Sequence, residues 1–185
     1  MPEIKSFTFS SEGTMRELPC DVSVLAADVT NPEEGKKAVK ARGIWDTGAS
    51  GSAITAEIAN ALGLKPVSMV DVHTAGGVKP SNVYIVDLLL PNDIMITNVE
   101  VTEADMTTQG VLIGMDVITL GDFALTNLGG KTRFTFSIPS TRVIDFVQEG
   151  QEFKRRAAMG QHGGQKNKAK RKTEKQNKKA GRKKR

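Results

Sequence analysis

The stretch Trp45-Asp46-Thr47-Gly48-Ala49-Ser50 decides how the chain around it is interpreted. Residues 38–45 before it predict a β-strand, and residues 54–62 after it carry apolar side chains at helical spacing. One interpretation is a strand that delivers a carboxylate into a glycine-containing loop. The other is an ordinary turn, because Asp, Thr, Gly and Ser are all turn formers. The context along the chain has to decide between them.

Outward from this stretch, the sequence predicts a mainly β protein with one or two short helices. Turn-forming residues separate short segments of strand character. The predicted strands are residues 5–10, 21–29, 38–45, 68–74, 78–86 and the overlapping 82–90, 94–103, 122–127, 132–138 and 142–147. Residues 111–114 are a short apolar run closed by glycine. One helix is predicted between Thr55 and Gly63, and a second, over 117–120, between Asp116 and Gly121. Many short strands at close spacing are typical of a β-barrel or a sandwich.

The net charge of +5 conceals two segments of opposite sign. Residues 154–185 contain 15 Lys and Arg and one acid, whereas residues 1–153 contain 11 basic and 20 acidic side chains, so the segments carry +14 and −9. After Phe153 no aromatic residue and no Leu, Ile or Val follows, which leaves too little apolar surface to fold. We therefore predict one folded domain over 1–150 and a disordered Lys/Arg-rich tail over 151–185. Such a tail suits non-specific nucleic-acid binding, or it only solubilises or targets the protein.

Other residue counts exclude several classes of protein. The single Cys20 excludes an internal disulfide framework and indicates a reducing compartment, or one where thiols do not matter; a cytoplasmic location is expected. No apolar run reaches the ~18 residues of a membrane helix, and the first thirty residues lack the pattern of a secretion signal, so no membrane partner is expected. Two histidines and one cysteine are too few ligands for a structural zinc site, and neither a metal nor a cofactor is predicted.

Two further motifs follow Asp46 along the chain. The pair Gly76-Gly77 begins 30 residues downstream between two predicted strands, and Leu112-Ile113-Gly114 ends 68 residues downstream. Together with Asp46-Thr47-Gly48 and the Leu-Ile-Gly-Met-Asp run at 112–116, these motifs resemble the retropepsin-like (retroviral-type) aspartic proteases. The resemblance is to the bacterial and cellular branch of that family and covers roughly residues 20–140.

The resemblance implies a closed β-barrel and a role for each matching residue. Asp46 would be the catalytic aspartate, Thr47 would tie two active-site loops together, and Gly48 would meet the substrate. The implied active-site loop continues through Ala49 and Ser50, the implied substrate-binding flap is Thr74, Ala75, Gly76 and Gly77, and the implied structural support is Leu112, Ile113, Gly114 and Asp116. Gly114 would pack under the catalytic loop. Asp116 departs from the viral enzymes, which carry a basic and an amide residue after this glycine, so viral substrate preferences are not transferred.

This resemblance also implies a reaction and an assembly. Peptide hydrolysis without a metal or a side-chain nucleophile needs a water molecule between two carboxyl groups, one that accepts a proton and one that polarises the scissile carbonyl. Two such groups about 3 Å apart share a proton, because two negative charges so close together repel each other and only one group ionises readily. The chain holds one Asp-Thr-Gly and no Asp-Ser-Gly. A second copy must then supply the second carboxylate, which predicts a two-fold homodimer acting on a peptide or protein substrate.

Other interpretations of these residues stay open. The glycine- and serine-rich stretch 48–52 could form a phosphate-binding loop, although it lacks the Gly-Lys-Ser/Thr ending that such loops carry. The hairpin around Gly76 is equally consistent with an ordinary surface turn. Two other functions compete with a protease: a non-catalytic peptide-binding module of the same fold, which captures extended peptides by strand addition, and a nucleic-acid or ribosome-associated protein that acts through its basic tail.

Overall fold

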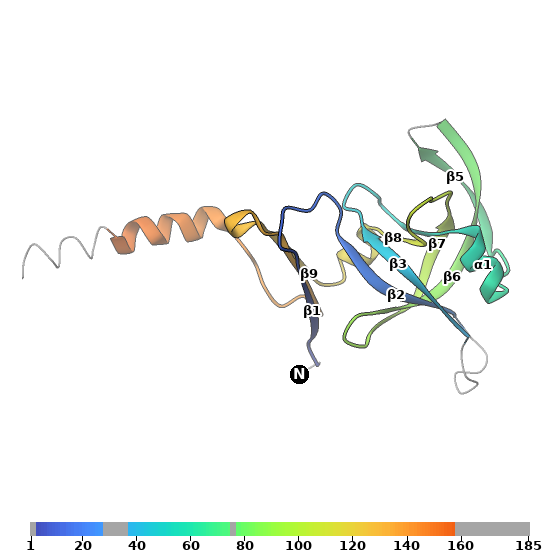
Figure 1. Ribbon diagram of the computed structural model, residues 1–185, viewed down its shortest axis with the longest axis horizontal. Helices are drawn as coiled ribbons and strands as arrows, with labels where there is room; N and C mark the ends of the chain where they lie inside the picture. Colours follow the sequence, from blue (N-terminus) through green and yellow to red (C-terminus); the bar gives the residue numbers. More distant parts are fainter. Residues whose placement is uncertain (1–2, 28–36, 75–76, 158–185) are drawn as a thin grey trace, which may run out of the picture. The chain divides into compact units, whose positions relative to one another are not determined.

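The computed structural model describes residues 3–27, 37–74 and 77–157 (Figure 1). The chain divides into two compact units, Met1–Arg142 and Val143–Arg185. The predicted turn at 31–35 and most of the predicted tail, residues 158–185, lie outside the described residues. Among the described residues, no helix is long and apolar enough to cross a membrane.

The first unit is built around a closed barrel of six strands. In order of pairing they are β2 (Pro19–Ala26), β3 (Ala38–Trp45), β8 (Val111–Ile113), β4 (Ser52–Ile54), β7 (Ile94–Glu103) and β6 (Gly77–Leu90). The barrel closes because β6 pairs with β2 as well as with β7. Fully buried Val24, Val86 and Ile113 belong to its core. The mainly β, closed-barrel fold predicted from the sequence is confirmed.

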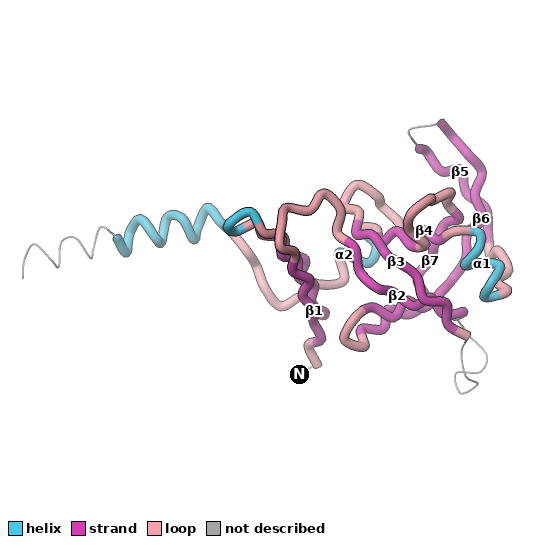
Figure 2. Tube along the Cα trace, in the orientation of Figure 1, coloured by secondary structure: helices cyan, strands magenta, loops and turns pink. Residues whose placement is uncertain are grey.

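One hairpin continues beyond the barrel. Strand β5 (Ser68–Thr74) pairs antiparallel with the first half of β6, from Ser68↔Val83 to Thr74↔Gly77. Figure 2 shows these two strands extending together away from the rest of the sheet. Gly77 belongs to β6 rather than to the turn, with a φ of 113°, while Ala75 and Gly76 lie outside the described residues. The strand predicted to begin at residue 78 therefore begins one residue earlier.

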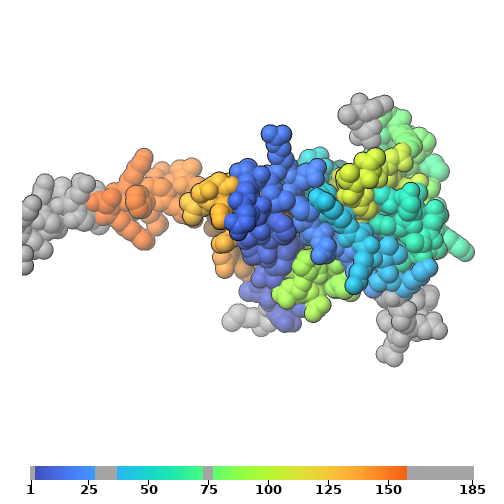
Figure 3. Space-filling view, viewed as in Figure 1, coloured from blue at the N-terminus to red at the C-terminus, as the bar shows by residue number. Residues whose placement is uncertain are grey.

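A separate three-stranded sheet, in the order β1-β10-β9, joins the two ends of the first unit. It consists of β1 (Lys5–Ser10), β10 (Arg133–Ile138) and β9 (Asp122–Thr126). Its Phe7, Phe134 and Phe136 pack around Trp45, the last residue of β3, with ring centroids 4.9–6.2 Å from the indole. Trp45 therefore connects this sheet to the strand that leads into Asp46. In the space-filling view, the N-terminal third of the chain, coloured blue to cyan, covers much of the visible face of this unit (Figure 3).

Three short helical segments complete the part of the first unit that the structure describes. Helix α1 (Ala56–Leu62) begins after Thr55, whose side chain makes no capping hydrogen bond, and ends at Gly63 in the left-handed conformation that favours glycine. Helix α2 (Met115–Ile118) begins two residues earlier than predicted, because Gly114 rather than Asp116 precedes its first residue. A 3-10 segment, η1 (Leu128–Gly130), connects β9 to β10.

The described part of the second unit contains a helix over residues 146–157. The predicted strand at 142–147 is therefore wrong. The carboxylate of Asp145 accepts hydrogen bonds from the backbone N–H groups of Val147 (2.9 Å) and Gln148 (3.1 Å), which satisfies the first donors of the helix. Residues 151–157, the first part of the segment predicted to be a disordered tail, belong to this helix.

Candidate active site

Three strands place the Asp46 loop at one end of the barrel. Strand β8 lies between β3, to which it is parallel, and β4, to which it is antiparallel. The chain leaves β3 at Trp45, crosses the end of β8 through residues 46–51, and returns along the other side of β8 as β4. The Asp46 N–H extends the β3–β8 pairing by one hydrogen bond, to the Ile113 carbonyl at 2.9 Å. Both ends of the loop are therefore fixed to the same short strand.

The Asp46 side chain is held within its own loop. Its Oδ1 accepts a hydrogen bond from the Gly48 N–H at 2.8 Å, and its carbonyl accepts one from the Ala49 N–H at 3.3 Å. A Cβ at Gly48 would lie 3.1 Å from the same Oδ1, closer than most such contacts. Asp46 and Ala49 are half-buried, whereas Thr47, Gly48 and Ser50 are exposed. The carboxylate is thus oriented by the backbone and remains open to solvent on one side.

Gly114 lies directly against the other part of this loop. A Cβ at Gly114 would lie 2.5 Å from the Gly51 carbonyl oxygen and 3.1 Å from that of Ala49, so only glycine fits there. The next two residues bind the loop: the Met115 N–H donates to the Ala49 carbonyl at 2.9 Å, and the Asp116 N–H donates to the Ser50 carbonyl at 3.2 Å. The structure therefore brings together the two motifs that the sequence separates by more than sixty residues.

Ser52 is a part of the site that sequence reasoning missed. Its N–H donates to Asp116 Oδ2 at 3.0 Å, and its hydroxyl donates to Asp116 Oδ1 at 2.8 Å. The Ser52 hydroxyl oxygen in turn accepts from the Gly114 N–H at 3.0 Å. Ser52 is 1% exposed. No signal in the local sequence indicates this role, because both of its partners lie more than sixty residues away.

Two of the four predicted flap residues lie in described strands: Thr74 ends β5 and Gly77 begins β6, and the two are paired. The other two, Ala75 and Gly76, lie outside the described residues. β5 lies at one end of the sheet order, next to β6. The structure therefore joins 46–52 to 112–116 in one compact site and places the hairpin on an extension of the barrel wall (Figure 1).

Cys20 lies behind the site rather than in it. The Trp45 indole N–H donates to its sulfur at 3.2 Å. Burial raises the pKa of the Cys20 thiol to about 11, so the thiol is protonated near neutral pH and is not poised to act as a nucleophile. Among residues 3–27, 37–74 and 77–157, no group of three or more His, Cys, Asp or Glu side chains is arranged to hold a metal ion.

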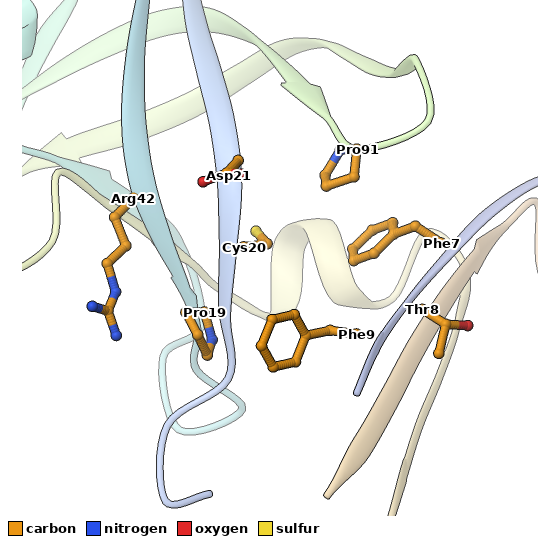
Figure 4. Close-up of a pocket in the computed structure, with 8 residues that line it drawn as sticks. All are labelled: Phe7, Thr8, Phe9, Pro19, Cys20, Asp21, Arg42 and Pro91. Carbon is orange, nitrogen blue, oxygen red and sulfur yellow. The ribbon is translucent and has the colours of Figure 1, made fainter. Parts of the chain in front are cut away.

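A cleft of about 420 Å³ lies elsewhere, between β1 and β2 (Figure 4). Its lining residues are Phe7, Thr8, Phe9, Pro19, Cys20, Asp21, Arg42 and Pro91. Neither the 46–52 loop nor residues 112–116 line this cleft, so it is not the candidate site. A site that two copies of a chain complete together need not form an enclosed pocket in one copy.

The two motifs of this site lie within a segment that matches a known protein family. Residues 33–117 match the family model described as aspartyl protease. These residues belong to the aspartyl protease family. The matched segment contains both Asp46-Thr47-Gly48 and Leu112-Ile113-Gly114, the motifs that meet in the structure. The family resemblance predicted from the sequence is confirmed.

Solved structures of this kind are similar only at a distance. A retropepsin-like aspartic protease from Rickettsia conorii is 14% identical, with a TM-score of 0.43, over 74% of this chain and 97% of that one. The protease of simian foamy virus is 16% identical, with a TM-score of 0.38, over 55% of this chain and 91% of that one. No curated protein matches the chain. The assignment of the aspartyl protease segment therefore rests on the family match.

Proposed function

We propose that this chain is an aspartic endopeptidase whose active site forms between two copies, each contributing Asp46. The observation that carries the proposal is the half-buried Asp46 carboxylate, fixed by the Gly48 N–H in a loop that packs against Gly114. The family match over residues 33–117 supports the same chemistry.

In the proposed reaction, a water molecule lies between the two Asp46 carboxyl groups. The ionised group takes a proton from this water while the oxygen attacks the carbonyl carbon of the peptide bond, and the protonated group donates to the carbonyl oxygen. As the tetrahedral intermediate collapses, the C–N bond breaks and the carboxyl group that took the water proton gives it to the leaving amine nitrogen. The other carboxylate takes back its proton from the hydroxyl of the intermediate, which leaves a carboxylic acid and restores the pair. Thr47 and Gly48 are proposed to hold the two loops and the substrate backbone, and residues 74–77 to close over an extended peptide as a flap.

We expect the purified protein to sediment as a dimer and to cleave members of a peptide library somewhere between pH 3 and pH 8, because one chain supplies only one Asp-Thr-Gly carboxylate. Cleavage should be inhibited by pepstatin. Analytical ultracentrifugation and mass spectrometry of the digest measure the two properties on one sample. A monomer at assay concentration that still cleaves would contradict the shared site, and a stable dimer without cleavage would favour a peptide-binding module instead.

We propose non-specific nucleic-acid binding as a second property, carried by the basic tail. Residues 158–185 contain 12 Lys and Arg against the single acid Glu174 and follow the described helix. Deleting these residues should abolish retention of the protein on columns that carry immobilised RNA or DNA. The salt dependence of that retention should also disappear, because binding by Lys and Arg releases counterions from phosphates. Retention is measured by elution at increasing salt. If the full chain and the shortened chain elute together, the tail does not bind nucleic acid.

A further inference from the structure

We infer that Ser52 and Asp116 form a clasp that fixes the orientation of the Asp46 loop, and that both act as positioning residues for the reaction. The inference rests on the proposed peptidase function and adds to it a pair of residues that act through the position of the Asp46 loop. Asp116 lies in α2 and Ser52 begins β4, so the clasp joins α2 to the strand that follows the loop.

The hydrogen bonds of the clasp have a fixed direction. The Asp116 carboxylate only accepts, so the Ser52 hydroxyl must donate its proton to Oδ1 and leave its lone pairs to the Gly114 N–H. The carboxylate also accepts from the backbone N–H groups of Ser52 and Val117. One carboxylate and one hydroxyl thereby satisfy three backbone donors. Ser52 is almost completely buried, so its polar groups depend on these partners rather than on water.

This arrangement determines where the loop ends. The Asp46 end is fixed by the pairing of β3 with β8, and the middle by the two backbone hydrogen bonds from Met115 and Asp116. At the far end, Ser52 sets the direction in which the chain leaves the loop. A shift there changes the path of residues 48–51 and with it the Gly48 N–H, which orients the Asp46 carboxylate. Displacing a reacting group by about 1 Å is enough to slow catalysis up to about a hundredfold.

The chain offers a matched control at Asp122. Its carboxylate also accepts from one serine hydroxyl, that of Ser140, and from two backbone N–H groups, those of Thr141 and Arg142. It lies in β9, outside the candidate site. The two carboxylates therefore accept hydrogen bonds from the same kinds of donor, one serine hydroxyl and two backbone N–H groups. Of the two, only Asp116 binds the Asp46 loop.

The test compares Ser52→Ala and Asp116→Asn with Ser140→Ala and Asp122→Asn in the full chain. In Asp116→Asn, the new amide NH₂ faces the backbone N–H of either Ser52 or Val117, so one hydrogen bond is lost whichever way the amide turns. We expect the first pair to lower kcat about tenfold or more while KM stays within about twofold, and the second pair to leave both constants unchanged. The double variant Ser52→Ala/Asp116→Asn should lose no more kcat than the worse single variant, because the two residues act as a unit.

A second readout separates this inference from the peptidase proposal. In ¹⁵N-labelled protein, hydrogen exchange of the Gly48 amide should be about tenfold faster in Ser52→Ala and Asp116→Asn than in the wild type. It should be unchanged in Ser140→Ala and Asp122→Asn. If wild-type protein shows no cleavage that depends on Asp46, the peptidase proposal fails and exchange at Gly48 alone decides the clasp. Unchanged kcat or unchanged Gly48 exchange in folded Ser52→Ala and Asp116→Asn would overturn the clasp, as would equal losses in the Asp122 and Ser140 variants.

Discussion

Replacing Asp46 with asparagine is expected to lower kcat/KM about a thousandfold or more, because the variant loses both the proton acceptor and the proton donor of the proposed site. The amide has the same size as the carboxyl group. Its oxygen can still accept the hydrogen bond that the Gly48 N–H donates to Oδ1 in the wild type. Fold and dimer should therefore be retained. Peptide cleavage, circular dichroism and sedimentation of the same preparation measure the three properties.

Asp93→Asn is the matched control for this substitution. Asp93 lies in the turn between β6 and β7 at a φ of 54°, a conformation that asparagine tolerates, and the backbone carbonyl that accepts a hydrogen bond from Lys5 is unchanged. This variant should cleave like the wild type. Substantial cleavage by Asp46→Asn would refute the assignment of the catalytic residue.

Mixed dimers test whether both copies contribute. When wild-type and Asp46→Asn chains are coexpressed in equal amounts, random pairing leaves about half of the wild-type chains in mixed dimers. If each site needs two Asp46 carboxylates, the activity per wild-type chain should fall to about half. Activity proportional to the wild-type chains alone would show that each copy works independently.

The strands with regular alternation were predictable from the sequence. Residues 5–10 and 38–45 match β1 and β3, because polar and apolar side chains alternate over residues 6–10 of the first segment and 39–42 of the second. Strand β4, Ser52–Ile54, was not predicted, since three residues are too few to show a period and the apolar spacing that follows belongs to α1. Its position depends on β7 and β8, which are remote in the sequence.

The error at 142–147 had a recognisable cause. The apolar residues there, Val143, Ile144, Phe146 and Val147, suggested a strand, but they surround Asp145. An aspartate followed three residues later by glutamine, here Gln148, is a signal for the start of a helix. The Asp145 hydrogen bonds show that this local signal prevailed over the strand pattern.

The candidate site was only partly predictable for a similar reason. Asp46 and Gly114 stand in short motifs that can be recognised in the sequence alone. The contact between them depends on the parallel pairing of β3 with β8, and the role of Ser52 depends on its hydrogen bonds to a carboxylate 64 residues away. Side-chain hydrogen bonds at such separation leave no periodic trace in the sequence.

Replacing Gly114 with alanine is expected to lower the free energy of unfolding by about 3 kcal/mol, because the added methyl group overlaps backbone that cannot turn aside as a side chain could. The new Cβ would lie 2.5 Å from the Gly51 carbonyl oxygen and 2.6 Å from its carbon. The backbone of Gly114, at φ −91° and ψ −172°, is itself open to alanine, so the effect is one of space and not of conformation. Urea unfolding at a fixed protomer concentration measures the loss.

Gly51→Ala distinguishes this contact from a general intolerance of the loop. Gly51 is the residue that the Gly114 methyl group would strike, yet a Cβ built on Gly51 itself meets nothing within 4 Å. This variant should change stability by no more than about 0.5 kcal/mol. The overlap in Gly114→Ala can be relieved only if the loop moves outward, so cleavage should fall in the fraction that remains folded, whereas Gly51→Ala should cleave normally. Equal stability and equal activity of the two variants would mean that the close approach of Gly114 to the loop does not fix the position of Asp46.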